Sequence, residues 1–250
     1  MPAVAGSGEL AAVQPTLYLG LVLGFVALFT VVATRITGHT TDAAIAETSF
    51  GDHARTVVVW HTSFAVAALV AASLADLPYS ALGLGPGTDA LRVGLGVGLA
   101  AVGLTLLLDV GLDRLGVPDD PNREASERLR TPTSAPQWLL HVSAVVPVQV
   151  LGTELLLRGA VVGGLGVTLG LHPVSLVMLS ALCHVVLVAP SGRRAMLVGA
   201  VAGALLAAAF LVTGSLLASA LAFLVVQGYD TVDNVRQYGT GRDRAADWMD

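Results

Sequence analysis

The chain has 250 residues, of which 54% are hydrophobic and only 12% charged, and its mean hydropathy is +0.76. Soluble domains carry about 25% charged residues, so this composition excludes an ordinary soluble protein and indicates a polytopic membrane protein. The net charge is −5 and all 13 basic residues are arginines without a basic face, which excludes nucleic acid as a partner.

Seven long apolar runs are the predicted elements, because a hydrocarbon core about 30 Å thick needs roughly 20 mostly apolar residues per helix. The runs lack the period-two alternation of barrel strands, which predicts helices. In chain order they cover 16–34, 56–75, 91–112, 137–159, 173–190, 195–213 and 214–230. We therefore expect an all-α, polytopic membrane protein with about seven transmembrane helices (six to eight), since only Thr213-Gly214-Ser215 separates the last two runs.

Outside these runs the chain offers little for a second domain. We expect a flexible N-terminal arm at 1–15, one transmembrane domain at 16–230 and a polar tail at 231–250. The arm contains Glu9 and no basic residue, unlike the start of a signal peptide, so the first helix is expected to be retained. The link 116–136 is rich in proline and charge, which predicts a loop with one short surface helix.

The arginines predict an orientation, because short cytoplasmic loops collect basic residues. With seven spans, eleven arginines fall in the first, third and fifth loops and in the tail, leaving Arg92 at a helix edge and Arg158 inside a helix. The N-terminus is then predicted outside and the C-terminus inside.

The fourth run contains the stretch "GTELLLRGAVV", which carries Glu154 and Arg158 in an apolar setting. An ionisable residue inside a membrane costs at least a few kcal/mol and is a functional candidate by default. The two residues lie four apart, so they share a helix face and predict an ion pair. A structural pair and a functional site both remain open on this evidence. His184, in "SALCHVVL" of the next run, adds an imidazole to the set.

The order of these motifs resembles the CPBP intramembrane protease family, which includes the type II CAAX prenyl endopeptidases. That family has a Glu-Glu-x-x-x-Arg helix, a Phe-x-x-x-His helix and a Gly-rich helix that leads through a Thr-Gly-Ser-like turn to a helix with His-x-x-x-Asn. The sequence "TELLLRG" is similar to the first motif, "SALCH" to the second and "GAVAGALLAAAFLVTGSLLASALAF" to the approach to the third. The resemblance covers about 137–230 and implies a CAAX-protease-like helical bundle. It also implies a catalytic pocket that opens toward the cytosol, whereas the arginine count puts Glu154 near the outer end of its helix, so the two orientations both remain open.

The resemblance implies catalytic roles for Glu154 and His184 and an amide-donor role for Gln227, and it matches Arg158 to the arginine of the first motif. Several positions depart from the family motifs. Thr153 replaces the first Glu, Ser180 the second-motif Phe, Phe223 the third-motif His and Gln227 the usual Asn. The family general base and one of its two histidines are therefore replaced.

Other catalytic arrangements are less consistent with helix geometry. Cys183 and His184 are neighbours that point about 100° apart, so Cys183 is interpreted as a small core residue. Ser180 shares a face with His184, but a helical Ser usually bonds the carbonyl four residues back. No cofactor is predicted. A divalent metal remains an alternative, but the histidines that would bind it lie in different segments without a ligand motif. These are His61, His141, His172 and His184.

Three functions remain as hypotheses. The first is an intramembrane endopeptidase that acts on or binds a membrane-embedded peptide or protein. The second is a pseudoprotease that binds a peptide, lipid or partner helix, and the third is a small transporter or proton relay through Glu154 and His184. We expect an integral protein of a prokaryotic plasma membrane, in contact with membrane lipid.

Overall fold

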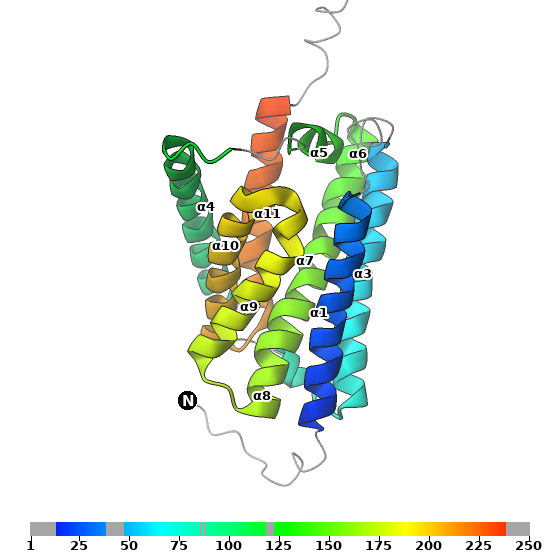
Figure 1. Cartoon of the computed structure of the whole chain (residues 1–250), viewed down its shortest axis with the longest axis vertical. Coiled ribbons are helices and arrows are strands. Elements are labelled where there is room, and N and C mark those ends of the chain that lie inside the picture. The colour runs from blue at the N-terminus through cyan, green and yellow to red at the C-terminus, as the bar shows by residue number, and fades with distance from the viewer. Residues whose placement is uncertain (1–13, 39–47, 86, 88, 119–122, 239–250) are drawn as a thin grey trace, which may run out of the picture.

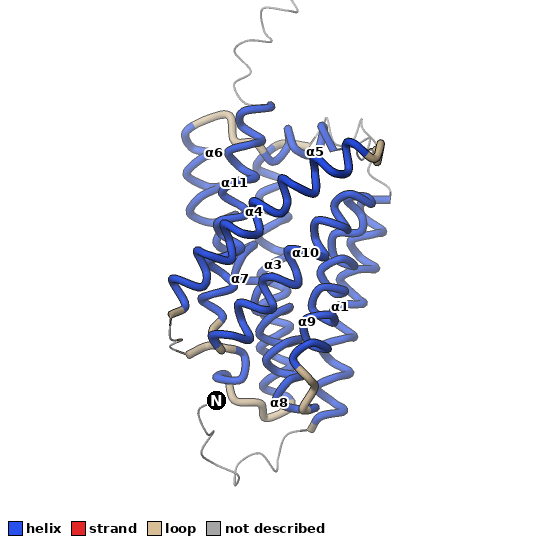
Figure 2. Tube along the Cα trace, turned by 90° about the vertical axis from the view of Figure 1, so that its left-hand side faces the viewer, coloured by secondary structure: helices blue, strands red, loops and turns tan. Residues whose placement is uncertain are grey.

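The computed structural model describes residues 14–38, 48–85, 87, 89–118 and 123–238. Within these ranges the chain consists of helices joined by loops and turns and contains no strand (Figure 2). Six helices are long and apolar enough to span a membrane, and α9 (Pro173–Val188) is a shorter apolar helix beside them. The expectation of an all-α, polytopic membrane protein is confirmed.

Each predicted run corresponds to one helical passage through the bundle. Residues Ala135–Leu169 form a single 35-residue passage that contains two π-helical segments. The elements are α1 (Pro15–Gly38), α3 (Phe50–Leu74), η2 (Tyr79–Leu82), α4 (Ala90–Arg114), α5 (Arg123–Arg130), α6 (Ala135–Leu140), η3 (His141–Val145), α7 (Val146–Glu154), η4 (Leu155–Gly164), α8 (Leu165–Leu169), α9, η5 (Ala189–Ser191), α10 (Gly192–Thr213) and α11 (Leu216–Tyr238). Helix α5 is the short helix predicted within 116–136, and α11 continues two turns past the predicted span.

The passages alternate in direction, so α1 starts at one end of the bundle and α11 finishes at the other (Figure 1). We call the end that carries α5 the arginine-rich end and the end that carries η2 the arginine-poor end. Helix boundaries place most described arginines at the arginine-rich end: Arg35, Arg55, Arg114, Arg123, Arg128, Arg130, Arg193, Arg194 and Arg236. Arg92, near the start of α4, is at the arginine-poor end.

Small residues bring α4 and α11 into close contact. A side chain at Gly94 would meet Ala218 O at 2.7 Å, and one at Gly98 would meet Ala222 O at 2.9 Å. The glycines follow the G-x-x-x-G spacing that allows membrane helices to approach closely, because lipid provides little hydrophobic force between helices. This contact holds α4, which lies at one side of the bundle (Figure 1), against α11.

Charged groups join α4 to α10 at the arginine-rich end. Arg194 Nε lies 2.9 Å from Asp109 Oδ1 and its Nη1 lies 2.7 Å from Asp113 Oδ1. Arg194 Nη2 also donates to Asp109 O at 3.2 Å. One guanidinium therefore binds two carboxylates one helical turn apart, which fixes the start of α10 against the last turns of α4.

Candidate functional site

Glu154 and Arg158 form an ion pair at the centre of the bundle. Both side chains are completely buried, and Arg158 Nη1 lies 3.0 Å from Glu154 Oε1. Among the described residues, neither Glu154 oxygen has an aligned hydrogen-bond partner, nor do Arg158 Nε and Nη1. The predicted ion pair is therefore held together by charge attraction more than by aligned hydrogen bonds.

His184 is the third member of this cluster. Arg158 Nη2 lies 3.3 Å from His184 Nδ1 and donates to Gly203 O at 3.2 Å. A guanidinium has only donors, so Nδ1 must be the unprotonated nitrogen of a neutral imidazole and the ring proton is on Nε2. One arginine thus connects η4, α9 and α10. We refer to Glu154, Arg158 and His184 as the buried triad.

Two glycines of α10 make room for His184. A side chain at Gly203 would approach His184 Cβ to 3.0 Å and Ala181 Cα to 3.1 Å, and one at Gly199 would approach Val188 Cγ2 to 2.8 Å. These glycines belong to the "GAVAG" stretch that the sequence analysis compared with the family. Their role here is steric, because they let α9 lie close enough to α10 for Arg158 to reach a carbonyl of α10.

The arginine of the triad lies in a π-helical segment of ten residues, η4. π-Helices are rare and usually one turn long, and they often occur at functional sites. Two neighbouring helices bond to carbonyl groups of this segment. Tyr18 Oη of α1 donates to Ala160 O at 3.0 Å, and Ser180 Oγ of α9 donates to Leu157 O at 3.4 Å. The expectation that Ser180 bonds within its own helix is therefore wrong, because an acceptor on η4 is within reach.

Helix α11 contributes an aromatic wall and a serine. The Phe223 ring lies 6.3 Å from the His184 ring in an edge-on arrangement. Ser219, one turn earlier, faces the Glu154 carboxyl, but its hydroxyl donates to Leu216 O at 3.2 Å.

Gln227 follows Phe223 by one turn and is half-buried, and Thr153 is buried beside Glu154 in the chain. The structure thus brings Glu154, Arg158, His184 and Phe223 together.

The sequence analysis did not identify Gly203 or Ser219 as members of this site. Gly203 contributes a backbone carbonyl, which no side-chain pattern marks. Ser219 lies one turn before Phe223, on the face of α11 that meets η4, so its spacing from Phe223 was the available signal.

The four histidines considered as metal ligands have separate surroundings. His61 Nδ1 donates to Val57 O at 2.8 Å, and His141 Nε2 lies 3.3 Å from Thr231 Oγ1. His172 is exposed and accepts from Val174 N at the start of α9, at 3.3 Å. Within the described ranges, no three His, Cys, Asp or Glu side chains gather closely enough to hold a metal ion. Cys183 is buried in the apolar core, as interpreted from the sequence.

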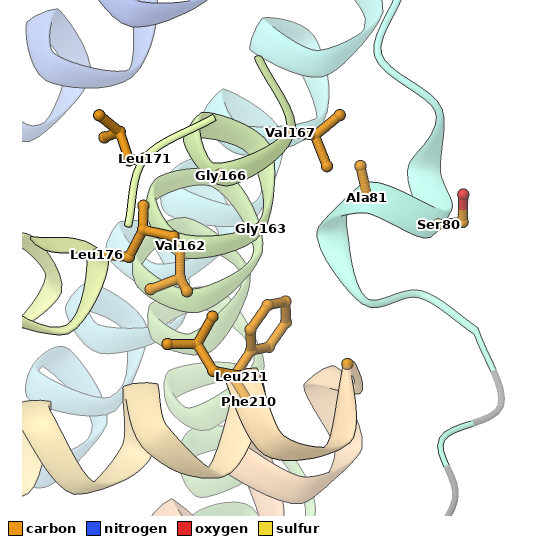
Figure 3. A pocket seen from close by; sticks show the side chains of 11 residues that line it. Ser80, Ala81, Val162, Gly163, Gly166, Val167, Leu171, Leu176, Phe210 and Leu211 are labelled. Atoms are coloured by element: carbon orange, nitrogen blue, oxygen red, sulfur yellow. The ribbon is translucent and has the colours of Figure 1, made fainter. Parts of the chain in front are cut away.

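An apolar cavity of about 330 Å³ lies one to two helical turns from the triad, toward the arginine-poor end, and Figure 3 shows the side chains that line it. It shares η4, α9 and α10 with the triad: Val162 follows Arg158 by one turn, and Leu176 precedes Ser180 by one turn. The lining residues are Ser80, Ala81, Val162, Gly163, Gly166, Val167, Leu171, Leu176, Phe210, Leu211 and Gly214. Ser80 provides the one side-chain hydroxyl of this lining.

No protein-family model, curated protein or solved structure matches this chain.

Proposed function

We propose that the chain is a CPBP-like pseudoprotease of a prokaryotic plasma membrane, which binds a membrane-embedded peptide segment without cleaving it. The observation that carries the proposal is the state of the triad. Glu154 and Arg158 are completely buried against each other, and the Nδ1 lone pair of His184 accepts from Arg158.

Amide hydrolysis requires a base that takes a proton from water at about 3 Å and donors that face the developing oxyanion. The Glu154 carboxylate is engaged with a guanidinium and has no exposed surface. His184 has only its N–H side left, which donates and does not accept. Thr153 occupies the position of the family base, and a hydroxyl is not a base near neutral pH. The triad therefore lacks a proton acceptor for the attacking water.

The resemblance to the CPBP family supports a shared architecture, because the positions selected from three sequence motifs meet in space. Glu154 and Arg158 come from the first motif, His184 from the second and Phe223 from the third. A proton relay is less well supported, since its groups must exchange protons, whereas Glu154 and Arg158 are completely buried against each other.

The experiment is incubation of the purified protein in liposomes with a library of membrane-embedded peptides. We expect no cleavage, with Glu154→Ala and His184→Ala as matched variants and mass spectrometry as the readout. We also expect cross-linking to a subset of peptides that carry photoreactive side chains. Cleavage that both variants abolish would overturn the proposal.

Restoring the missing groups tests the correspondence with the family. The double variant Thr153→Glu, Phe223→His adds a carboxylate at the family base position and a second imidazole beside His184. We expect peptide cleavage to appear in the double variant and not in either single variant. Thermal unfolding in detergent checks that the double variant is folded, and no cleavage from a folded double variant would contradict the motif correspondence.

A further inference from the structure

We infer that the apolar cavity at the arginine-poor end binds one acyl chain of a membrane phospholipid. The cavity is separate from the triad, so this inference does not depend on the proposed function. Its walls come from η2, η4, α8, α9 and α10 and from the Gly214 turn (Figure 3).

The chemistry of the lining selects an aliphatic ligand. Ten of the eleven lining residues are glycine, alanine, valine, leucine or phenylalanine, and none is charged. The volume of about 330 Å³ lies near the lower limit for small-molecule sites, which are concave and mostly apolar. A ligand that needs charge neutralisation or several hydrogen bonds has no partner in these side chains.

Two glycines create part of this space. Gly166 is half-buried, and a side chain there would first meet the flexible end of Leu176, at 3.1 Å. Gly214 has φ +63°, in the left-handed region that favours glycine, and a side chain there would meet no atom within 4 Å. The turn at Gly214 ends α10 and sends the chain into α11.

The cavity is an open depression in the surface of the bundle, not an enclosed space. Val167, at its edge, is 48% exposed, and it lies in the last turns of a membrane-spanning passage. Phe210 and Leu211 lie at the end of α10, whose 22 residues are about 33 Å long, so the cavity extends inward from one boundary of the hydrocarbon layer. The surrounding medium at this depth is the acyl chains of one leaflet.

Ser80 is the one polar side chain of the lining. It is exposed on η2 and stands apart from Val162, Leu176 and Phe210 in Figure 3, so the side chains that meet in the cavity are apolar.

Photo-crosslinking tests this inference on the full chain in liposomes of phosphatidylethanolamine and phosphatidylglycerol. The probe is a phospholipid with a diazirine on one acyl chain, which loses N₂ under light and inserts into a neighbouring C–H bond. We expect cross-links concentrated on Val162, Leu176, Phe210 and Leu211. Gly166→Leu, which places a side chain in the cavity, is expected to abolish them.

Gly96→Leu is the matched control, because a side chain at Gly96 on α4 would meet no atom within 4 Å. It makes the same chemical change outside the cavity and is expected to leave the cross-links unchanged. Ala81→Leu fills the cavity from the opposite wall and gives an independent variant if Gly166→Leu unfolds.

Cross-links spread evenly over exposed leucines such as Leu99 and Leu107 would overturn the inference. Preferential labelling of the cavity by a diazirine-bearing transmembrane peptide would also overturn it.

Discussion

At the residue scale, Arg158 is the side chain on which the centre of the bundle depends. It contacts Glu154, His184 and the Gly203 carbonyl, and it is the largest completely buried side chain among the described residues. Removing one partner of a buried ion pair typically costs about 3–5 kcal/mol, because the other charge remains buried without compensation.

We therefore predict that Arg158→Met strongly lowers the thermal unfolding temperature in detergent. The double variant Glu154→Met, Arg158→Met should recover most of the lost stability, because replacing both charges by apolar groups of similar size is often neutral or stabilising. Circular dichroism during heating, in one detergent for all variants, measures both effects. If the double variant is as unstable as Arg158→Met, the bonds from Arg158 to His184 and Gly203 O determine the stability instead.

The residues of the site differ in how well the sequence identified them. Glu154, Arg158 and His184 stand out because charge and imidazole are rare in apolar runs, and their contact is now observed. The bond from Ser180 to Leu157 O required knowledge of which helix lies beside α9. Gly203 acts through its carbonyl, so its identity as glycine indicated close packing but not hydrogen bonding.

At the element scale, the clearest relation between sequence and structure is the contact of α4 with α11. We predict that Gly98→Leu destabilises the protein by about 1–3 kcal/mol or more, which is the usual cost of overpacking a tight interface. The new side chain would start 2.7 Å from Val225 Cβ and 2.9 Å from Ala222 O. Unfolding temperature in detergent is the measurement.

Gly96→Leu again provides the control, since it lies two residues away on the same helix with open space around it. It should leave the unfolding temperature nearly unchanged. Equal losses from the two substitutions would mean that helix propensity, rather than packing against α11, accounts for the effect of Gly98→Leu.

The apolar runs predicted the helices well because hydrocarbon thickness sets their length, but they did not predict the helix ends or the π segments. Helix α11 continues to Tyr238 through Asp230 and Asp233, residues that a search for apolar runs excludes. The first π segment ends just before Pro147, which lacks the amide N–H that an α-helix would bond to Ser143 O, whereas the sequence of η4 contains no proline. Contacts with neighbouring helices, such as the bond from Tyr18 to Ala160 O, accompany the altered backbone of η4 and come from residues distant in sequence.

At the scale of the whole molecule, the distribution of arginine predicts how the bundle lies in the membrane. Apart from Arg92 and Arg158, the described arginines gather at the end that carries α5, and cytoplasmic loops attract basic residues. We predict that this end faces the cytoplasm, with the N-terminus outside. Leu115, which is 78% exposed, lies at the arginine-rich end, whereas exposed Asp76 lies at the other end.

Single cysteines at these two positions test the orientation. In a Cys183→Ala background, a membrane-impermeant maleimide added to intact cells should label Asp76→Cys and not Leu115→Cys. Permeabilised cells should allow both to react, which controls for the reactivity of each thiol. The reverse pattern in intact cells would contradict the orientation.

The ten-residue π segment also affects how the chain tolerates changes in length. A π-helix closes its hydrogen bonds over five residues instead of four, so it contains more backbone per turn than an α-helix. Removing one residue between Leu155 and Gly164 could be absorbed by a local return to α-helical bonding, whereas an α-helix would have to rotate everything beyond the deletion. The passage that carries the triad is therefore the one best able to lose a residue without moving its two ends relative to the bundle.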